Sequence, residues 1–208
     1  MTCIVGMQRN GVVWLGADSL ASNENIKYTS DSPKLVYFPG EGNNKALVIG
    51  FTTSWRLGQL LQYNLDVPEH YADDSDMEYI VADLIPVIRE TFKEGGFLAQ
   101  ISNNGEVGRE QGGSFIIAYN GILYEITADF SVIAPKEGYV AVGSGYLVAT
   151  GAIAFHKINN PKAHPLKTLH KVLEATSKHN PFTAPPFIFA KVCKKDAIFY
   201  YDEEIEQE

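Results

Sequence analysis

The sequence predicts an α+β protein in which two β-sheets are stacked face to face and each carries a pair of helices on its outer surface, a four-layer α/β/β/α sandwich. Three observations support this. Runs rich in β-branched and aromatic residues occur at the start, middle and end of the chain, two pairs of amphipathic segments separate them, and Asn-Gly turns at 10–11 and 120–121 join neighbouring runs. The element order β-α-α-β-α-α-β fits this layering, and 208 residues correspond to a single domain spanning residues 1–208.

The first half of the chain is predicted to form a group of strands followed by two helices. Strands are expected at 2–8, 12–15, 26–29, 35–38 and 46–49. The first helix would run from about Ser54 to Asn64. The second would run from Asp74 to about Lys93, with an acidic first turn and a kink at Pro86.

The second half is predicted to repeat this order and then to end in two further strands. Strands are expected at 114–119, 122–126, 132–135, 139–142, 186–192 and 197–201. Between the fourth and fifth of these, helices are expected at 146–157 and 165–178.

Composition and charge exclude several classes of function. Seventeen basic and 25 acidic residues give a net charge of -8, which argues against a nucleic-acid partner because such proteins present a basic surface. No run approaches the 18 apolar residues of a membrane span and no leader is recognised, so we expect a cytoplasmic protein with no membrane partner. The five histidines and two cysteines lack metal-ligand spacing, so neither a metal site nor a cofactor is expected.

The most informative stretch is the beginning of the chain, where Thr2 follows the initiator methionine. Because threonine has a small side chain, Met1 can be trimmed, which leaves Thr2 with a free α-amine beside its own hydroxyl. A hydroxyl is a weak nucleophile until a base takes its proton, and an α-amine with a pKa of about 8 is a suitable base at neutral pH. Thr2 could therefore serve as nucleophile and base in one residue.

Asp18 and Lys34 are predicted to complete this arrangement. An ammonium from Lys34 would favour the neutral amine of Thr2 and stabilise negative charge on its hydroxyl oxygen, while Asp18 would anchor Lys34. The predicted hairpin returns Asp18 to the start of the first strand, where Thr2 lies. The structural alternative is that Thr2 merely opens a strand, Asp18 begins a turn and Lys34 is a solvated charge.

Together, Thr2, Gly16-Ala17-Asp18 and Lys34 resemble the proteasome β-subunit family of N-terminal-nucleophile hydrolases, including its bacterial two-ring relative. In this chain Asp18 and Lys34 follow Thr2 by 16 and 32 residues, the spacings of that family. The resemblance implies the same four-layer sandwich over essentially the whole chain.

The resemblance also implies roles for further residues. A glycine between a strand and a helix can present its N–H to a developing oxyanion, and Gly50 matches the family glycine that does so. Val48 and Ile49 would line the pocket for the substrate side chain, and Ser22 would bind the substrate backbone. Ser144, in Gly143-Ser144-Gly145, would join the hydrogen bonds around the α-amine.

The chain departs from the family pattern after the last helix, where the family has an aspartate followed three positions later by a serine or threonine. Here Asn180 replaces the aspartate and Thr183 keeps the hydroxyl. Asparagine donates and accepts hydrogen bonds but carries no charge, so we expect an altered amine pKa.

These observations predict a threonine-type endopeptidase that acts on peptides or proteins. The resemblance implies a ring-shaped homo-oligomer and an ATP-driven unfoldase as a partner. Two alternatives remain open: a catalytically silent, assembly-forming scaffold protein of the same fold, and an amidase that acts on a small acyl amide.

Overall fold

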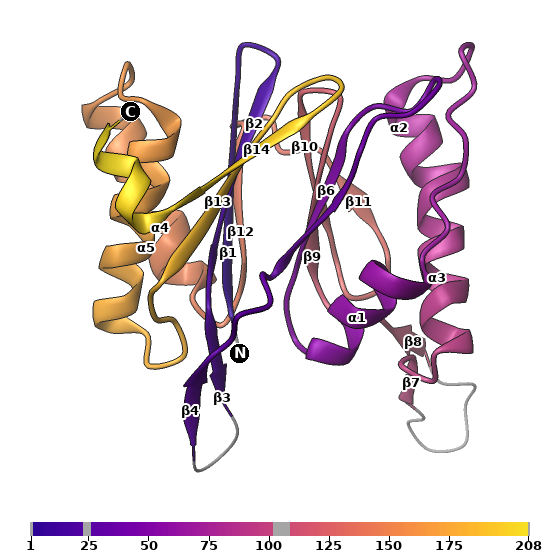
Figure 1. The fold of residues 1–208 in the computed structure, drawn as a ribbon, viewed down its shortest axis with the longest axis horizontal. Helices are drawn as coiled ribbons and strands as arrows, with labels where there is room; N and C mark the ends of the chain where they lie inside the picture. Colours follow the sequence, from indigo (N-terminus) through magenta and orange to yellow (C-terminus); the bar gives the residue numbers. More distant parts are fainter. Residues whose placement is uncertain (1, 23–25, 102–108, 208) are drawn as a thin grey trace.

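Two five-stranded antiparallel sheets lie face to face, and helices cover the outer surface of each (Figure 1). The computed structural model describes residues 2–22, 26–101 and 109–207, so the predicted removal of Met1 falls outside the described residues. The arrangement confirms the predicted α/β/β/α sandwich.

The first sheet contains both ends of the chain. In spatial order it consists of β12 (Tyr139–Gly143), β1 (Cys3–Arg9), β2 (Val12–Asp18), β13 (Phe187–Val192) and β14 (Ala197–Tyr201). Its outer face is covered by α4 (Tyr146–Asn159) and α5 (Pro165–His179). A 3-10 helix, Asp202–Gln207, follows β14 and was not predicted from the sequence.

The second sheet is built from the middle of the chain. Its order is β11 (Val132–Ile133), β10 (Ile122–Ile126), β9 (Phe115–Tyr119), β6 (Leu47–Phe51) and β5 (Leu35–Phe38). The helical elements on its outer side are α1 (Trp55–Asn64), the short α2 (Asp76–Glu78), a π-helical turn (Tyr79–Leu84) and α3 (Ile85–Glu94).

The predicted helix from Asp74 to Lys93 forms as one continuous helical stretch, with a π-helical turn just before Pro86. Proline has no N–H, and its ring clashes with the carbonyl four residues earlier in an α-helix. The wider π turn accommodates this defect, and Pro86 then occupies the first turn of α3, where no N–H is needed.

Both Asn-Gly turns form the tight hairpins that the sequence predicts. Asn10 and Gly11 have φ values of 52° and 70°, and Asn120 and Gly121 have φ values of 49° and 79°. Two successive positive φ values are typical of the type I′ turn, whose twist matches that of the strands it joins. The first turn fixes the register that brings Asp18 back to the start of β1.

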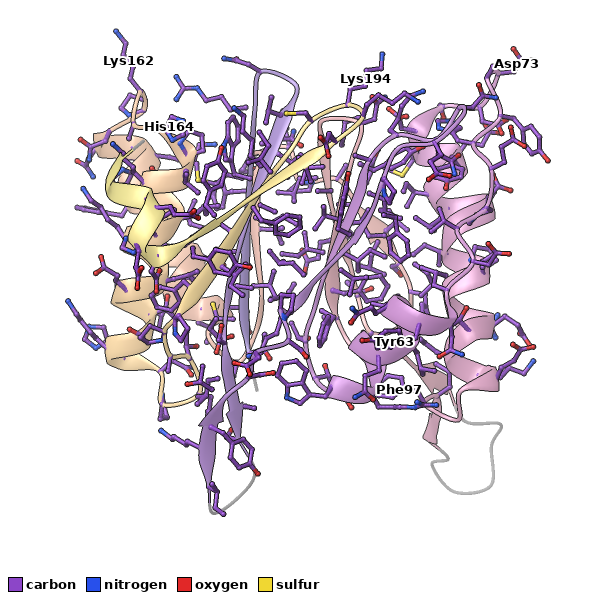
Figure 2. The ribbon with its side chains drawn as sticks, viewed as in Figure 1. Tyr63, Asp73, Phe97, Lys162, His164 and Lys194 are labelled. Atoms are coloured by element: carbon purple, nitrogen blue, oxygen red, sulfur yellow. The ribbon has the colours of Figure 1, made fainter. Side chains whose placement is uncertain are left out.

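Three buried hydrophobic clusters correspond to the three interfaces between the four layers. One lies between the second sheet and its helices, one between the two sheets, and one between the first sheet and its helices. Figure 2 shows the side chains that fill these layers. Each sheet therefore carries buried apolar side chains on both of its faces.

Two small ribbons lie outside the main sheets: β3 (Leu20–Ser22) with β4 (Lys27–Thr29), and β7 (Ala99–Ile101) with β8 (Arg109–Gln111). The strand expected at 26–29 is thus real but does not join a large sheet. The β3–β4 ribbon projects at the end of the sandwich where the N-terminus lies (Figure 1). Over the described residues, no helix has the length and apolar character needed to cross a membrane.

Candidate active site

Thr2 lies just before β1 and is almost fully buried. Its backbone nitrogen donates to Ser144 Oγ at 3.3 Å, and Ser144 Oγ donates to the Thr2 carbonyl oxygen at 3.2 Å. The pairing of β1 with β12, in which Cys3 faces Gly143, produces this contact. Gly143 has a φ of 90°, and a Cβ there would lie 2.2 Å from the Thr2 carbonyl oxygen, so only glycine fits beside Thr2.

Asp18 ends β2 and is 1% exposed. Its Oδ1 accepts from Cys3 N and from Lys34 Nζ, both at 2.9 Å. Its Oδ2 accepts from Leu20 N at 3.2 Å and from Ala184 N at 3.4 Å. These four donors hold the Asp18 carboxylate in one position next to the start of β1.

Lys34 is 2% exposed, so the alternative that it is a solvated charge is wrong. Its Nζ donates to Asp18 Oδ1 at 2.9 Å and to the Leu20 carbonyl oxygen at 2.7 Å, and it lies 5.8 Å from the centre of the Trp55 ring. Burial lowers the pKa of Lys34 below its usual 10.5, while the charge of Asp18 opposes this shift. The result is a desolvated cation held in one position.

Two cavities meet at Thr2. The larger, of about 590 Å³, is lined by Thr2 together with Glu125 and Ser144. The smaller, of about 290 Å³, is lined by Thr2 together with Ser22, Lys34 and Trp55. The structure thus brings Thr2, Lys34, Ser144 and Ser22 to one place, as the sequence predicts for these four residues.

Gly50 does not lie at a strand–helix junction, which corrects the prediction. Strand β6 continues through Gly50 to Phe51, and Gly50 pairs with Leu35 on one side and Ile116 on the other. A Cβ at this position would lie 2.6 Å from Ile4 Cγ2, so the glycine allows the two sheets to approach each other. This packing explains Gly50 without an oxyanion role.

Val48 and Ile49 do not face the site either. Both are fully buried on opposite faces of β6: Val48 packs between the two sheets, and Ile49 packs against the helices of the second sheet. The part of this segment that lines the cavities comes later, at Phe51, Thr52 and Thr53. The prediction placed the end of the strand too early along the chain.

Thr52 and Thr53, which the sequence analysis did not single out, line both cavities beside Thr2. Thr52 Oγ1 donates to the Ser114 carbonyl oxygen at 2.6 Å. Thr53 has a φ of 72°, a strained conformation for a β-branched residue of the kind that clusters at functional sites. Among the backbone groups and side chains that the structure describes, none accepts a hydrogen bond from the backbone N–H of either threonine. The clue in the sequence is three hydroxyl residues, Thr52 to Ser54, between a buried strand and a helix.

Asn180 and Thr183 lie together next to Ser144. Asn180 Nδ2 donates to the Ser144 carbonyl oxygen at 2.7 Å, and its Oδ1 accepts from Phe182 N at 2.8 Å and from Thr183 Oγ1 at 3.5 Å. The amide uses both its donor and its acceptor here, which a carboxylate could not do. Asn180 therefore positions the turn that carries Ser144 without adding charge.

We expect Asn180→Asp to lower the free energy of unfolding by about 1–2 kcal/mol at pH 8, because an ionised carboxylate cannot donate to the Ser144 carbonyl and repels it. Urea unfolding at pH 8 and at pH 4 measures this, since the introduced carboxyl group can donate once it is protonated and the loss should shrink at pH 4. Gln62→Glu, the same exchange of amide for acid at an exposed residue of α1, is the control and should change little. Unchanged stability at both pH values would show that the Asn180–Ser144 contact does not hold this turn.

Cys3, next to Thr2 in the chain, is not a competing nucleophile. It is fully buried, and burial together with the nearby charge of Asp18 raises the pKa of its thiol to about 12. A thiol that stays protonated at neutral pH is unreactive. Over the described residues, no group of three or more His, Cys, Asp or Glu side chains is arranged to hold a metal ion.

Neither a protein-family model nor a curated protein sequence matches the chain, but solved structures match its fold over nearly the full length. BPH of Thiobacillus denitrificans is 17% identical, with 96% of this chain and 98% of that chain covered and a TM-score of 0.66. HslV of Trypanosoma brucei is 20% identical, with 95% and 98% covered and a TM-score of 0.58. Anbu of Hyphomicrobium sp. strain MC1 is 12% identical, with 99% and 91% covered and a TM-score of 0.68. The chain therefore has the fold of the proteasome-like N-terminal-nucleophile hydrolases.

Proposed function

We propose that the chain is a threonine-type endopeptidase whose nucleophile is Thr2, exposed by removal of Met1. The observation that carries this proposal is the buried Asp18–Lys34 ion pair at a cavity that Thr2 also lines. Burying two charges is costly and contributes little net stability compared with apolar packing. An ion pair buried beside the Thr2 hydroxyl supports a chemical role for the pair.

The proposed reaction has two stages. Thr2 Oγ1 attacks the peptide carbonyl carbon while the Thr2 α-amine takes the hydroxyl proton, and the tetrahedral intermediate collapses as the C–N bond breaks and the leaving amine receives that proton. This leaves an ester between Thr2 and the acyl part of the substrate. A water molecule, deprotonated by the same amine, then hydrolyses the ester and releases a carboxylic acid.

The surrounding residues have supporting roles in this proposal. Lys34, anchored by Asp18, stabilises the negative charge that develops at Thr2, and Ser144, held by Asn180 with Thr183, positions the amine. A backbone N–H of Thr52 or Thr53 takes the oxyanion role first assigned to Gly50, because both residues line the cavities that contain Thr2. Ser22, in the smaller cavity, contacts the substrate backbone.

The presence of two cavities that are both lined by Thr2 favours a peptide over a small acyl amide. A peptide extends in both directions from the bond that is cleaved, so it can occupy both cavities at once. Their volumes of about 590 and 290 Å³ give room for side chains next to that bond. A small amide would need only one of them.

A ring-shaped homo-oligomer and an ATP-driven unfoldase partner are also part of the proposal. An exposed apolar stripe on α4 supports self-association: Leu147, Phe155 and Ile158 are 70%, 71% and 79% exposed and follow helical spacing on one face. Isolated exposed apolar residues are normal, but several on one helix face are typical of a contact surface.

The test of the proposed function is the intact mass of the purified chain, followed by hydrolysis of peptides. We expect a mass that lacks one methionine, together with peptide cleavage that a covalent reagent for N-terminal threonine blocks. A chain that retains Met1 has an amide instead of an amine at Thr2 and has no base for the reaction. That result would contradict the endopeptidase and favour the assembly-forming scaffold.

A further inference from the structure

A partly buried carboxylate, Glu125, lies in the larger cavity together with Thr2 and Ser144. It belongs to β10, where it pairs with Ile116 of β9 and Ile133 of β11. Successive residues of a strand point to opposite faces, so Glu125 shares its face with Leu123, whose side chain packs between the two sheets. Glu125 therefore lies on the inner face of the second sheet, at the end of the sandwich where Thr2 lies.

The surroundings of Glu125 differ from those of the Asp18 carboxylate. Asp18 receives four hydrogen bonds, one of them from an ammonium group. Among the side chains and backbone groups that the structure describes, by contrast, none donates a hydrogen bond to the Glu125 carboxylate or forms an ion pair with it, and burial raises the pKa of this carboxyl above its usual value. A desolvated carboxylate without a partner is unfavourable, and a cation that enters the cavity would relieve this cost.

The smaller cavity has the opposite character. Among the described residues that line it, Lys34 is the one charged group and is already paired with Asp18, and the aromatic side chains of Phe51 and Trp55 also line the cavity. It therefore suits an uncharged side chain. The two cavities beside Thr2 would discriminate between different groups of one substrate.

We infer that Glu125 makes the larger cavity a subsite for a positively charged group of the substrate, an ammonium or guanidinium side chain close to the bond that is cleaved. The inference rests on the proposed function in that it assigns the cavity to the same substrate. The Glu125 carboxylate accepts hydrogen bonds from the cation, and Tyr146, which also lines the cavity, provides an aromatic wall.

The test measures binding, so that it can be interpreted whether or not the chain cleaves peptides. The full-length Thr2→Ala protein is titrated by fluorescence anisotropy with fluorescein-labelled Gly-Ala heptapeptides that carry one lysine at successive positions. Matched peptides carry norleucine, which keeps the apolar stem of lysine but lacks the ammonium. At the position that reaches Glu125 we expect the lysine peptide to bind about tenfold more tightly than its norleucine counterpart.

Glu125→Gln in the same background keeps the size of the side chain and removes its charge, and the preference for lysine should disappear. Glu137→Gln, which removes an exposed carboxylate, is the matched control and should retain the preference. Equal binding of lysine and norleucine peptides, a preference that survives Glu125→Gln, or no binding of any lysine peptide at millimolar concentration would each overturn the inference. A preference for lysine that depends on Glu125, in a chain that cleaves no peptide, would leave the subsite in place and overturn the endopeptidase alone.

Discussion

Thr2→Ala is expected to abolish peptide hydrolysis, with a loss in kcat of about 10³-fold or more, because the variant keeps the α-amine and the Asp18–Lys34 pair but has no hydroxyl to attack the substrate. The cavities beside Thr2 remain, so KM for the residual activity should change far less than kcat. Steady-state kinetics on an internally quenched peptide separate the two parameters.

The fold should tolerate this variant, since the contacts that Ser144 makes with residue 2 use its backbone nitrogen and carbonyl oxygen, which alanine retains. Thr2→Ser, which restores a hydroxyl, should recover a large part of the activity. Thr150→Ala on α4 is the matched control for the loss of a threonine hydroxyl away from the cavities. Hydrolysis at the wild-type rate by Thr2→Ala would remove Thr2 from the mechanism and direct attention to another nucleophile.

The part of the site that the sequence predicts is the part fixed by local structure. Thr2 and Asp18 are brought together by one hairpin whose Asn-Gly turn can be recognised in the sequence, and Lys34 lies immediately before β5, the next strand of the large sheets. The numbers of residues that separate Thr2, Asp18 and Lys34 along the chain therefore help to predict that these residues lie close together in the fold. Ser144 was predicted from the resemblance alone, and it is the pairing of β1 with β12, in which Cys3 faces Gly143, that brings it to Thr2.

The residues that were placed wrongly depend on pairing between distant segments. Whether β6 ends at Gly50 or at Phe51 is decided by its contacts with β9, more than sixty residues later, where Phe51 pairs with Phe115. A shift of one or two residues in this register moves different side chains to the cavities. This is why Val48 and Ile49 were assigned to the substrate pocket while Thr52 and Thr53 were overlooked.

Glu125 was missed because alternation alone does not identify which face of a strand is buried. In the run from Ile122 to Ile126 a glutamate between apolar residues is typical of a solvent-facing position. Both faces of β10 are covered in the folded chain, one by helices and one by the other sheet. The carboxylate therefore points into a cavity, which only the stacking of the two sheets creates.

The second large effect is expected for Lys34→Met, which should both inactivate the chain and destabilise its fold. Methionine fills a similar volume but leaves the Asp18 carboxylate, 1% exposed, without its cation. Breaking one half of a buried ion pair costs about 3–5 kcal/mol of the free energy of unfolding, measured by urea denaturation. Activity on the quenched peptide should fall to background, because the negative charge that develops at Thr2 also loses its cation.

A second variant separates the two effects of this substitution. Asp18→Asn combined with Lys34→Met removes both charges, so we expect it to recover part of the lost stability and none of the activity. Lys93→Met, which breaks the exposed Lys93–Glu90 pair on α3, is the matched control and should cost less than about 1 kcal/mol. If the double variant were stable and cleaved peptides at the wild-type rate, the ion pair would be a structural feature and the endopeptidase mechanism proposed for Thr2 would lose its main support. If it were stable and inactive, the charge on Lys34 would be needed for the reaction and not for the fold.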